Sequence, residues 1–116
     1  MTPTLYGIAN CDTVKKARAW LDGHGAAYRF HDFRKLGVPE DELRRWIAAV
    51  GWERLVNRQG TTWRRLDEAE RAGVVNAASA TVVMRAQPSL VRRPVLVIGE
   101  EVVIGFDAAR YGVLFG

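Results

Sequence analysis

The spacing of hydrophobic and polar residues predicts a strand, a helix and a second strand in the first third of the chain. A short apolar run at 5–8 is typical of a buried strand. Apolar residues then recur at helical spacing, which predicts a helix from about Thr13 to Gly23. Residues 27–32 predict a second strand, so the order favours a parallel pair of strands with a right-handed crossover.

The middle of the chain predicts helices. We expect a polar loop over 34–38, followed by a helix over 39–51 in which three acidic residues precede apolar residues at helical spacing. The pattern is weaker over 52–87, where it predicts two short helices at 67–71 and 79–85.

The last part of the chain predicts a strand pair and a final helix. The strands are expected at 94–98 and 102–104, joined by a tight turn, and Asp107 is expected to cap the helix that follows. The whole order predicts one α/β domain over residues 1–116. Its helical insertion, at about residues 51–87, would separate the second strand from the third.

Composition and charge narrow the classes of function. A length of 116 residues and an apolar share of 48% suit one globular core. The net charge of +4 comes mostly from arginine, whose planar guanidinium suits bidentate binding of carboxylates and oxyanions. Acidic residues are interspersed, so we expect no direct nucleic-acid partner. No apolar run has the length of a membrane span or a signal peptide, which predicts a cytoplasmic protein with no membrane partner.

Cys11 is the single cysteine, and it lies where the first predicted strand meets the first predicted helix. The free N–H groups of a helix start, together with the positive end of the helix dipole, favour a thiolate and can bind an anion. One cysteine cannot form an internal disulfide, so a redox cycle would need a thiol from another molecule. The alternative is an inert thiol, because free cysteine is among the most buried residue types.

Three features could meet at Cys11: the helix start at 12–14, Arg58 in the middle segment, and Arg93 with Pro94. A proline at the first residue of a strand costs no ladder hydrogen bond. The Arg93–Pro94 bond could be cis, which usually marks a tight functional turn, but the residues alone leave an ordinary trans bond as the alternative.

Three stretches of the chain, 5–21, 88–97 and 103–106, resemble the ArsC/Spx family. That family includes glutaredoxin-linked arsenate reductases, Spx-type transcription regulators and the YffB group. The string Asn-Cys-Asp-Thr-Val-Lys-Lys-Ala at 10–17 looks most like YffB. The resemblance covers essentially the full length, and it implies a thioredoxin-like (glutaredoxin-like) fold with a helical insertion between the second and third strands.

The resemblance also implies roles for individual residues. Cys11 matches the family's nucleophilic cysteine, and Arg58 matches an arginine of the insertion that faces it. Arg93 matches the arginine before the family's cis-proline, which is Pro94 in this chain. The residues expected to bind substrate, an anion or glutathione are Asn10, Asp12, Thr13, Val14, Arg58, Arg93 and Pro94.

The chain departs from the family pattern at three places. The reductases carry a third arginine on the last strand, where this chain has Gly105 and Phe106, so oxyanion binding is expected to be weaker or different. Spx-type regulators have a second cysteine where this chain has Val14. Asp12 replaces a small neutral residue, and a carboxylate beside a thiol opposes its ionisation.

We therefore expect a reductase that depends on glutathione or glutaredoxin, in which Cys11 attacks an oxyanion such as arsenate or a mixed disulfide. Glutathione would be a co-substrate held beside Pro94, as the resemblance implies. We expect no bound cofactor and, because the histidines are scattered, no metal. The alternative is an Spx-like regulatory protein that binds RNA polymerase or another protein without catalysis, through a surface that includes Arg44 and Arg45.

Overall fold

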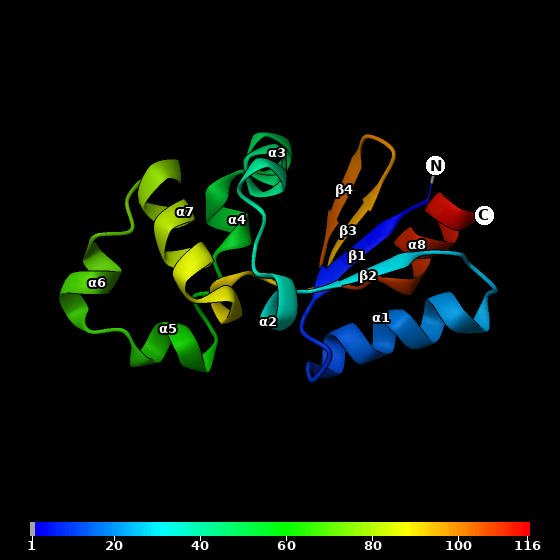
Figure 1. Cartoon of the computed structure of the whole chain (residues 1–116), viewed down its shortest axis with the longest axis horizontal. Coiled ribbons are helices and arrows are strands. Elements are labelled where there is room, and N and C mark those ends of the chain that lie inside the picture. Colours follow the sequence, from blue (N-terminus) through cyan, green and yellow to red (C-terminus); the bar gives the residue numbers. More distant parts are fainter. Residues whose placement is uncertain (1) are drawn as a thin grey trace. The chain divides into compact units, whose positions relative to one another are not determined.

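The computed structural model describes residues 2–116, and its contacts divide them into two compact units (Figure 1). The first unit joins the residues up to Lys35 with Arg93–Gly116. The second unit is Leu36–Arg92, so in sequence it separates the two halves of the first.

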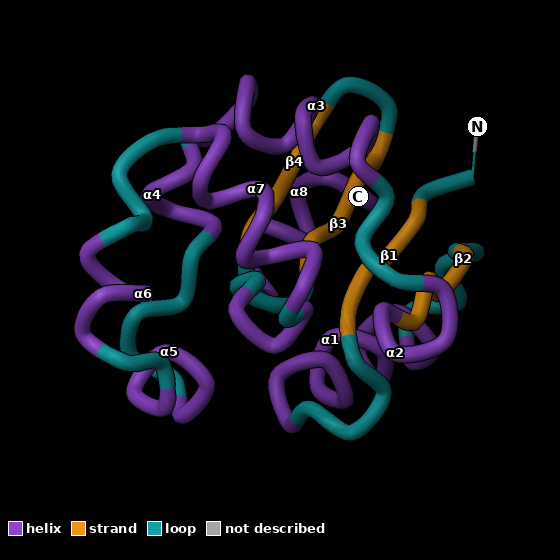
Figure 2. The backbone as a smooth tube through the Cα atoms, turned by 60° about the vertical axis from the view of Figure 1, so that its left-hand side comes forward, coloured by secondary structure: helices purple, strands orange, loops and turns teal. Residues whose placement is uncertain are grey.

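A four-stranded sheet forms the centre of the first unit (Figure 2). Its strands are β1 (Thr4–Gly7), β2 (Arg29–Asp32), β3 (Val95–Ile98) and β4 (Glu101–Ile104), in the spatial order β2-β1-β3-β4. Strand β1 pairs in parallel with β2 and antiparallel with β3, and β3 pairs antiparallel with β4. The parallel first pair and the later strand pair, both predicted from the sequence, are confirmed.

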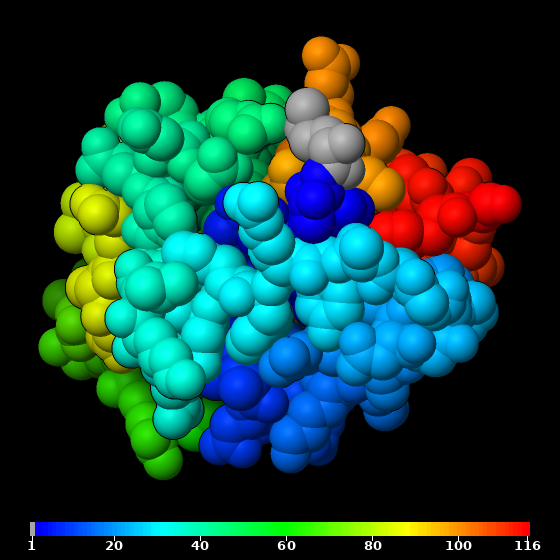
Figure 3. Space-filling view, turned by 45° about the vertical axis from the view of Figure 1, so that its right-hand side comes forward, coloured from blue at the N-terminus to red at the C-terminus, as the bar shows by residue number. Residues whose placement is uncertain are grey.

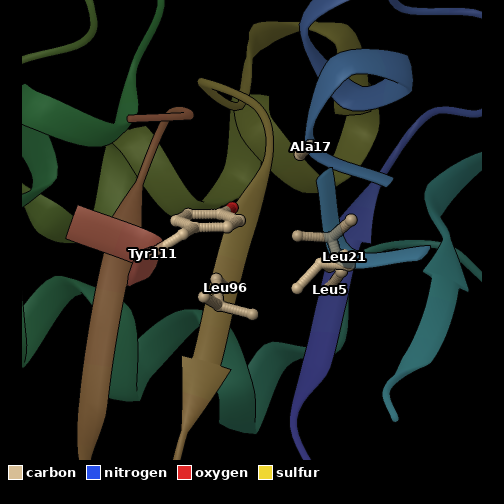
Figure 4. Close-up of a cluster of buried hydrophobic side chains, with 5 residues drawn as sticks. All are labelled: Leu5, Ala17, Leu21, Leu96 and Tyr111. Atoms are coloured by element: carbon tan, nitrogen blue, oxygen red, sulfur yellow. The ribbon is translucent and has the colours of Figure 1, made fainter. Parts of the chain in front are cut away.

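Two helices, α1 (Asp12–Gly23) and α8 (Ala108–Phe115), pack against one face of this sheet. Figure 4 shows the side chains that meet there: Leu5 and Leu96 from the strands, Leu21 from α1 and Tyr111 from α8. Leu5 and Leu96 are register partners, so they project from the same face of the sheet. All four side chains are fully buried, and burial of each leucine stabilises the fold by about 1.5–3 kcal/mol.

Helix α8 begins where the sequence predicts. Asp107 is its N-cap residue, and its carboxylate accepts hydrogen bonds from the backbone N–H groups of Ala109 at 2.9 Å and Arg110 at 3.3 Å. In the space-filling view α8, in red, lies beside the later part of α1, in light blue (Figure 3). The rings of Trp20 and Phe115 join the two helices, with 6.0 Å between their centroids.

Short helices build the second unit. They are α3 (Glu40–Val50), α4 (Trp52–Leu55), α5 (Thr61–Arg65), α6 (Glu68–Ala72), α7 (Ala77–Ala86) and the 3₁₀ turn η1 (Pro88–Leu90). Capping boxes start α6, through Asp67 and Glu70, and α7, through Asn76 and Ser79. An isolated antiparallel bridge between Val56 and Val91 ties the segment after α4 to the segment after η1.

Three one-turn helices were not predicted from the sequence. The loop expected over 34–38 is wrong in its first part, because α2 (Phe33–Leu36) covers residues 34–36. Helices α4 and α5 also lie in segments without a recognisable period. A single helical turn is too short to repeat an apolar position, so the hydrophobic pattern carries no signal for it.

The arrangement confirms an α/β fold with a thioredoxin-like core and a helical insertion between the second and third strands. The boundaries expected for that insertion, residues 51–87, stay a prediction. Within the described residues 2–116, no helix has the length and apolar character needed to cross a membrane.

Replacing Asp107 by alanine is expected to lower the free energy of unfolding by about 1 kcal/mol, because two backbone N–H groups of α8 lose their acceptor. Asp107→Asn keeps an oxygen acceptor and should lose clearly less. Urea denaturation measures both variants. Equal losses in the two would contradict the capping role of the side chain.

Candidate functional site

Cys11 lies in the connection from β1 to α1, and close packing fixes that connection. Its N–H donates to the carbonyl of Ile8 at 3.1 Å, which closes the turn before the helix. A Cβ atom on Gly7 would come within 2.8 Å of the Val14 side chain, so only glycine lets the end of the strand approach the first turn of the helix this closely. The thiol is therefore held at a defined place relative to the sheet.

Cys11 is the N-cap residue of α1, and its carbonyl accepts the hydrogen bond of Lys15 N–H at 2.9 Å. Its side chain accepts no capping hydrogen bond of ordinary length and angle. Negative charge on the sulfur is nevertheless favoured by its surroundings. Burial raises the pKa of the thiol, but the backbone N–H of Val14, the side chain of Arg93 and the N–H of Thr13 together lower it below the ordinary value.

Among residues 2–116, Arg93 is the charged side chain that lowers the pKa of Cys11, both by a hydrogen bond and by its positive charge. It belongs to the same compact unit as Cys11 and lies two residues before the start of β3. The Arg93–Pro94 peptide bond is cis, as the resemblance implied. The Pro94 carbonyl accepts the N–H of Gly105 at 2.8 Å, which ties the residues before β3 to those after β4.

The other residues near Cys11 that were predicted to bind a ligand differ in how exposed their side chains are. Asn10, Asp12 and Thr13 are exposed, whereas the Val14 side chain is fully buried. Val14 can therefore offer a ligand only its backbone N–H. The opposition of the Asp12 carboxylate to ionisation of the thiol stays a prediction; its side chain is exposed, and water screens an exposed charge strongly.

Arg58 belongs to the second unit, in the loop between α4 and α5. Its guanidinium carbon lies over the ring of Trp52, 5.5 Å from the centroid, and over that of Trp63, 5.8 Å from the centroid. Its approach to Cys11, which the resemblance implies, stays a prediction.

No group of three or more histidine, cysteine, aspartate and glutamate side chains among residues 2–116 could hold a metal ion. The Nδ1 atom of His24 lies 2.8 Å from the carbonyl oxygen of Trp20, one helical turn earlier. Its ring also stacks on the Trp20 ring.

Sequence reasoning missed three residues of structural importance to these sites. Gly7 admits Val14, and a glycine inside a strand pattern is a known signal of close approach. Trp52 and Trp63 both contact the guanidinium of Arg58. Their spacing from Arg58 carries no periodic signal, so the contact could be found only in three dimensions.

The fold and the thiol site together define a thioredoxin-like protein with a single cysteine at a helix N-terminus. A model of the ArsC family matches residues 6–114, and the chain belongs to this family.

Relatives support the same placement. A protein of Haemophilus influenzae is 38% identical over 112 residues, which cover 97% of each chain. The Spx global transcriptional regulator of Streptococcus mutans is 27% identical over 110 residues, covering 90% of this chain and 76% of the regulator. These matches confirm the assignment to the ArsC/Spx family.

Solved structures extend the comparison. The structure of a YffB protein has a TM-score of 0.94 and 48% identity, covering 99% of this chain and all of the YffB chain. An arsenate reductase-related protein of Brucella melitensis is 50% identical, with a TM-score of 0.75 and coverage of 99% and 95%. The likeness to the YffB group, first suggested by the string at 10–17, is confirmed.

Arg93→Ala is expected to slow the alkylation of Cys11 by iodoacetamide at neutral pH by roughly threefold to tenfold, because the thiolate loses its positive neighbour. Arg93→Lys keeps the charge and should lie between the wild type and Arg93→Ala. The matched control is Arg29→Ala, which removes an exposed arginine of β2. Mass spectrometry measures the rates, and an Arg93→Ala rate equal to that of the wild type across the pH range would rule out this role.

Proposed function

We propose that the chain is a glutathione-dependent thiol reductase in which Cys11 is the nucleophile. The observation that carries this proposal is the position of Cys11 at the N-terminus of α1, where the first turn of the helix and Arg93 lower the pKa of the thiol against the effect of burial. A lowered pKa increases the thiolate fraction at neutral pH, and the thiolate is the reactive form. An inert buried thiol would have its pKa raised.

The reaction needs a second thiol, and it has to come from another molecule because Cys11 is the single cysteine of the sequence. The Cys11 thiolate attacks the glutathione sulfur of a mixed disulfide, and a Cys11–glutathione disulfide forms while the substrate thiolate leaves and takes a proton from water. The thiolate of a second glutathione, which has lost its proton to water, then attacks that glutathione sulfur. Glutathione disulfide leaves, and the Cys11 thiolate is restored.

The residues around Cys11 suit this exchange. The N–H groups of Thr13 and Val14 and the side chain of Arg93 favour negative charge on the sulfur in the free enzyme. They would do the same when Cys11 leaves from the mixed disulfide, since a thiol of lower pKa leaves faster. The backbone beside Pro94 would hold the glutathione peptide, and exposed Asn10 would supply a further polar contact. Arg58, in the second unit, is proposed as an anion-binding residue. A glutaredoxin could replace free glutathione in the second step.

A mixed disulfide suits the site better than arsenate. Near the position where the resemblance to the reductases implies a third arginine, the chain has Gly105 and Phe106, and the Phe106 ring packs edge-on against Tyr111 with 4.9 Å between centroids. That position is therefore filled by an apolar contact and offers no positive charge to an oxyanion.

The regulatory alternative gains no specific support from the surface first suggested for it. Arg44 and Arg45 form ion pairs with Glu40, Asp41 and Glu42 on their own helix, α3. Their charges are therefore largely compensated by neighbouring carboxylates. The two arginines give no specific evidence that this surface binds an acidic partner.

Cys11→Ser is expected to abolish turnover of the mixed disulfide of glutathione and 2-mercaptoethanol, because a hydroxyl cannot form the intermediate. Glutathione disulfide production, coupled to glutathione reductase and NADPH, measures the rate. Arsenate, tested with the same reductant, should be turned over much more slowly by the wild type. Circular dichroism checks that the variant is folded, and full turnover by folded Cys11→Ser would refute the proposed mechanism.

A further inference from the structure

We propose that Trp52 and Trp63 are positioning residues for Arg58: their ring faces hold the guanidinium plane and leave its N–H donors for an anion with two oxygen atoms. This inference rests on the role proposed above for Arg58 as an anion-binding residue. It adds how the side chain is oriented and which class of ligand the orientation suits, namely a carboxylate or a tetrahedral oxyanion.

The contacts of Arg58 with both rings come from different elements. Trp52 is the first residue of α4, and Trp63 lies in α5. The distances of 5.5 and 5.8 Å from the guanidinium carbon to the two ring centroids lie within the range of a favourable cation–π contact. Both tryptophans are half-buried, while Arg58 itself is exposed. The rings are thus part of the packed unit, and the cation lies at its surface.

The backbone around Arg58 is also fixed. The N–H of Asn57 donates to the carbonyl of Leu90 at 2.8 Å, next to the bridge between Val56 and Val91. The side-chain oxygen of Asn57 accepts the N–H of Gln59 at 3.1 Å, a short turn that spans Arg58. An arginine on a fixed turn between two rings has lost much of its rotamer freedom before any ligand binds, so binding costs less conformational entropy.

The contacts of Arg58 leave its hydrogen-bonding edge available. Among residues 2–116 it has no hydrogen bond and no ion pair, and its described partners are the two rings. Arg44 and Arg45, in contrast, are paired with carboxylates on α3. The guanidinium carbon lies over both rings, and cation–π contacts of this kind use none of the N–H donors, which lie in the guanidinium plane. That fork matches two oxygens of one anion.

The structural alternative is that the arginine only joins α4 to α5. Under that alternative the tryptophans would matter for folding, and Arg58 would bind an anion no better than any other exposed arginine. Arg64, an exposed residue of α5, is the matched comparison because it carries the same charge on a neighbouring element.

The experiment follows the side-chain Nε–H signals of ¹⁵N-labelled arginine by NMR during titration with sodium sulfate. Arg58→Lys assigns the Arg58 signal by its loss. In the wild type, ring currents should displace the Arg58 signal from that of Arg64, and sulfate should shift it further. Trp52→Leu with Trp63→Leu should move the signal back and weaken sulfate binding at Arg58 by roughly threefold to tenfold, whereas Trp52→Phe with Trp63→Phe should retain most of the affinity.

A second titration distinguishes a carboxylate from a tetrahedral oxyanion as the group that binds Arg58. Glutathione should shift the Arg58 signal, and its diethyl ester should not, if the bound group is a carboxylate. A response to sulfate alone would assign the site to tetrahedral oxyanions.

Two results separate the possible failures. If Arg58→Ala and Arg64→Ala weaken sulfate binding to the folded protein equally, the anion-binding role of Arg58 fails. If Arg58→Ala weakens it but both leucine replacements leave it within twofold of the wild type, the positioning role of the tryptophans fails. A wild-type Arg58 signal that coincides with that of Arg64 would overturn the orientation before either tryptophan is replaced. None of these outcomes depends on turnover at Cys11.

Discussion

The stabilisation of negative charge on the Cys11 sulfur is the interaction on which this site depends. Partial burial by itself disfavours a thiolate, so the surrounding donors have to outweigh that cost. They include the backbone N–H groups of Thr13 and Val14, which are available because the first N–H groups of a helix have no intrahelical acceptor. The side chain of Arg93 adds a hydrogen bond and a positive charge.

The fold supplies these donors through packing in the first unit. Gly7 allows the end of β1 to approach Val14, which places the helix start directly after the strand. The buried contact of α1 with the sheet then holds the helix axis, and the register of β3 beside β1 brings Arg93 to the same unit. The chemistry of one thiol is therefore linked to the packing of three elements. Because no second cysteine is present to complete a disulfide, the proposed cycle is open to thiols in solution.

The sequence predicts the helices and strands whose apolar residues recur at a regular spacing or whose start is marked by a capping residue. It misses the elements that have neither signal. Helix α1 and the N-cap at Asp107 could be placed because apolar spacing and a capping residue are local signals. One-turn helices such as α2 carry no repeat. The junction at Cys11 was visible for the same local reason, whereas the action of Arg93 on its thiol depends on residues far apart in sequence. The proline that follows Arg93 marked it as a candidate, and the family resemblance placed it beside the cysteine.

Direct titration of the Cys11 thiolate tests the central claim most directly. The ultraviolet absorbance of the thiolate is followed against pH in the wild-type protein, with Cys11→Ser as the blank, and the single cysteine makes the signal unambiguous. We predict a midpoint below the ordinary thiol value of about 8.5, so that the thiolate fraction at neutral pH exceeds that of a free cysteine. A midpoint at or above that value would contradict the account, because burial would then outweigh the helix N–H groups and Arg93.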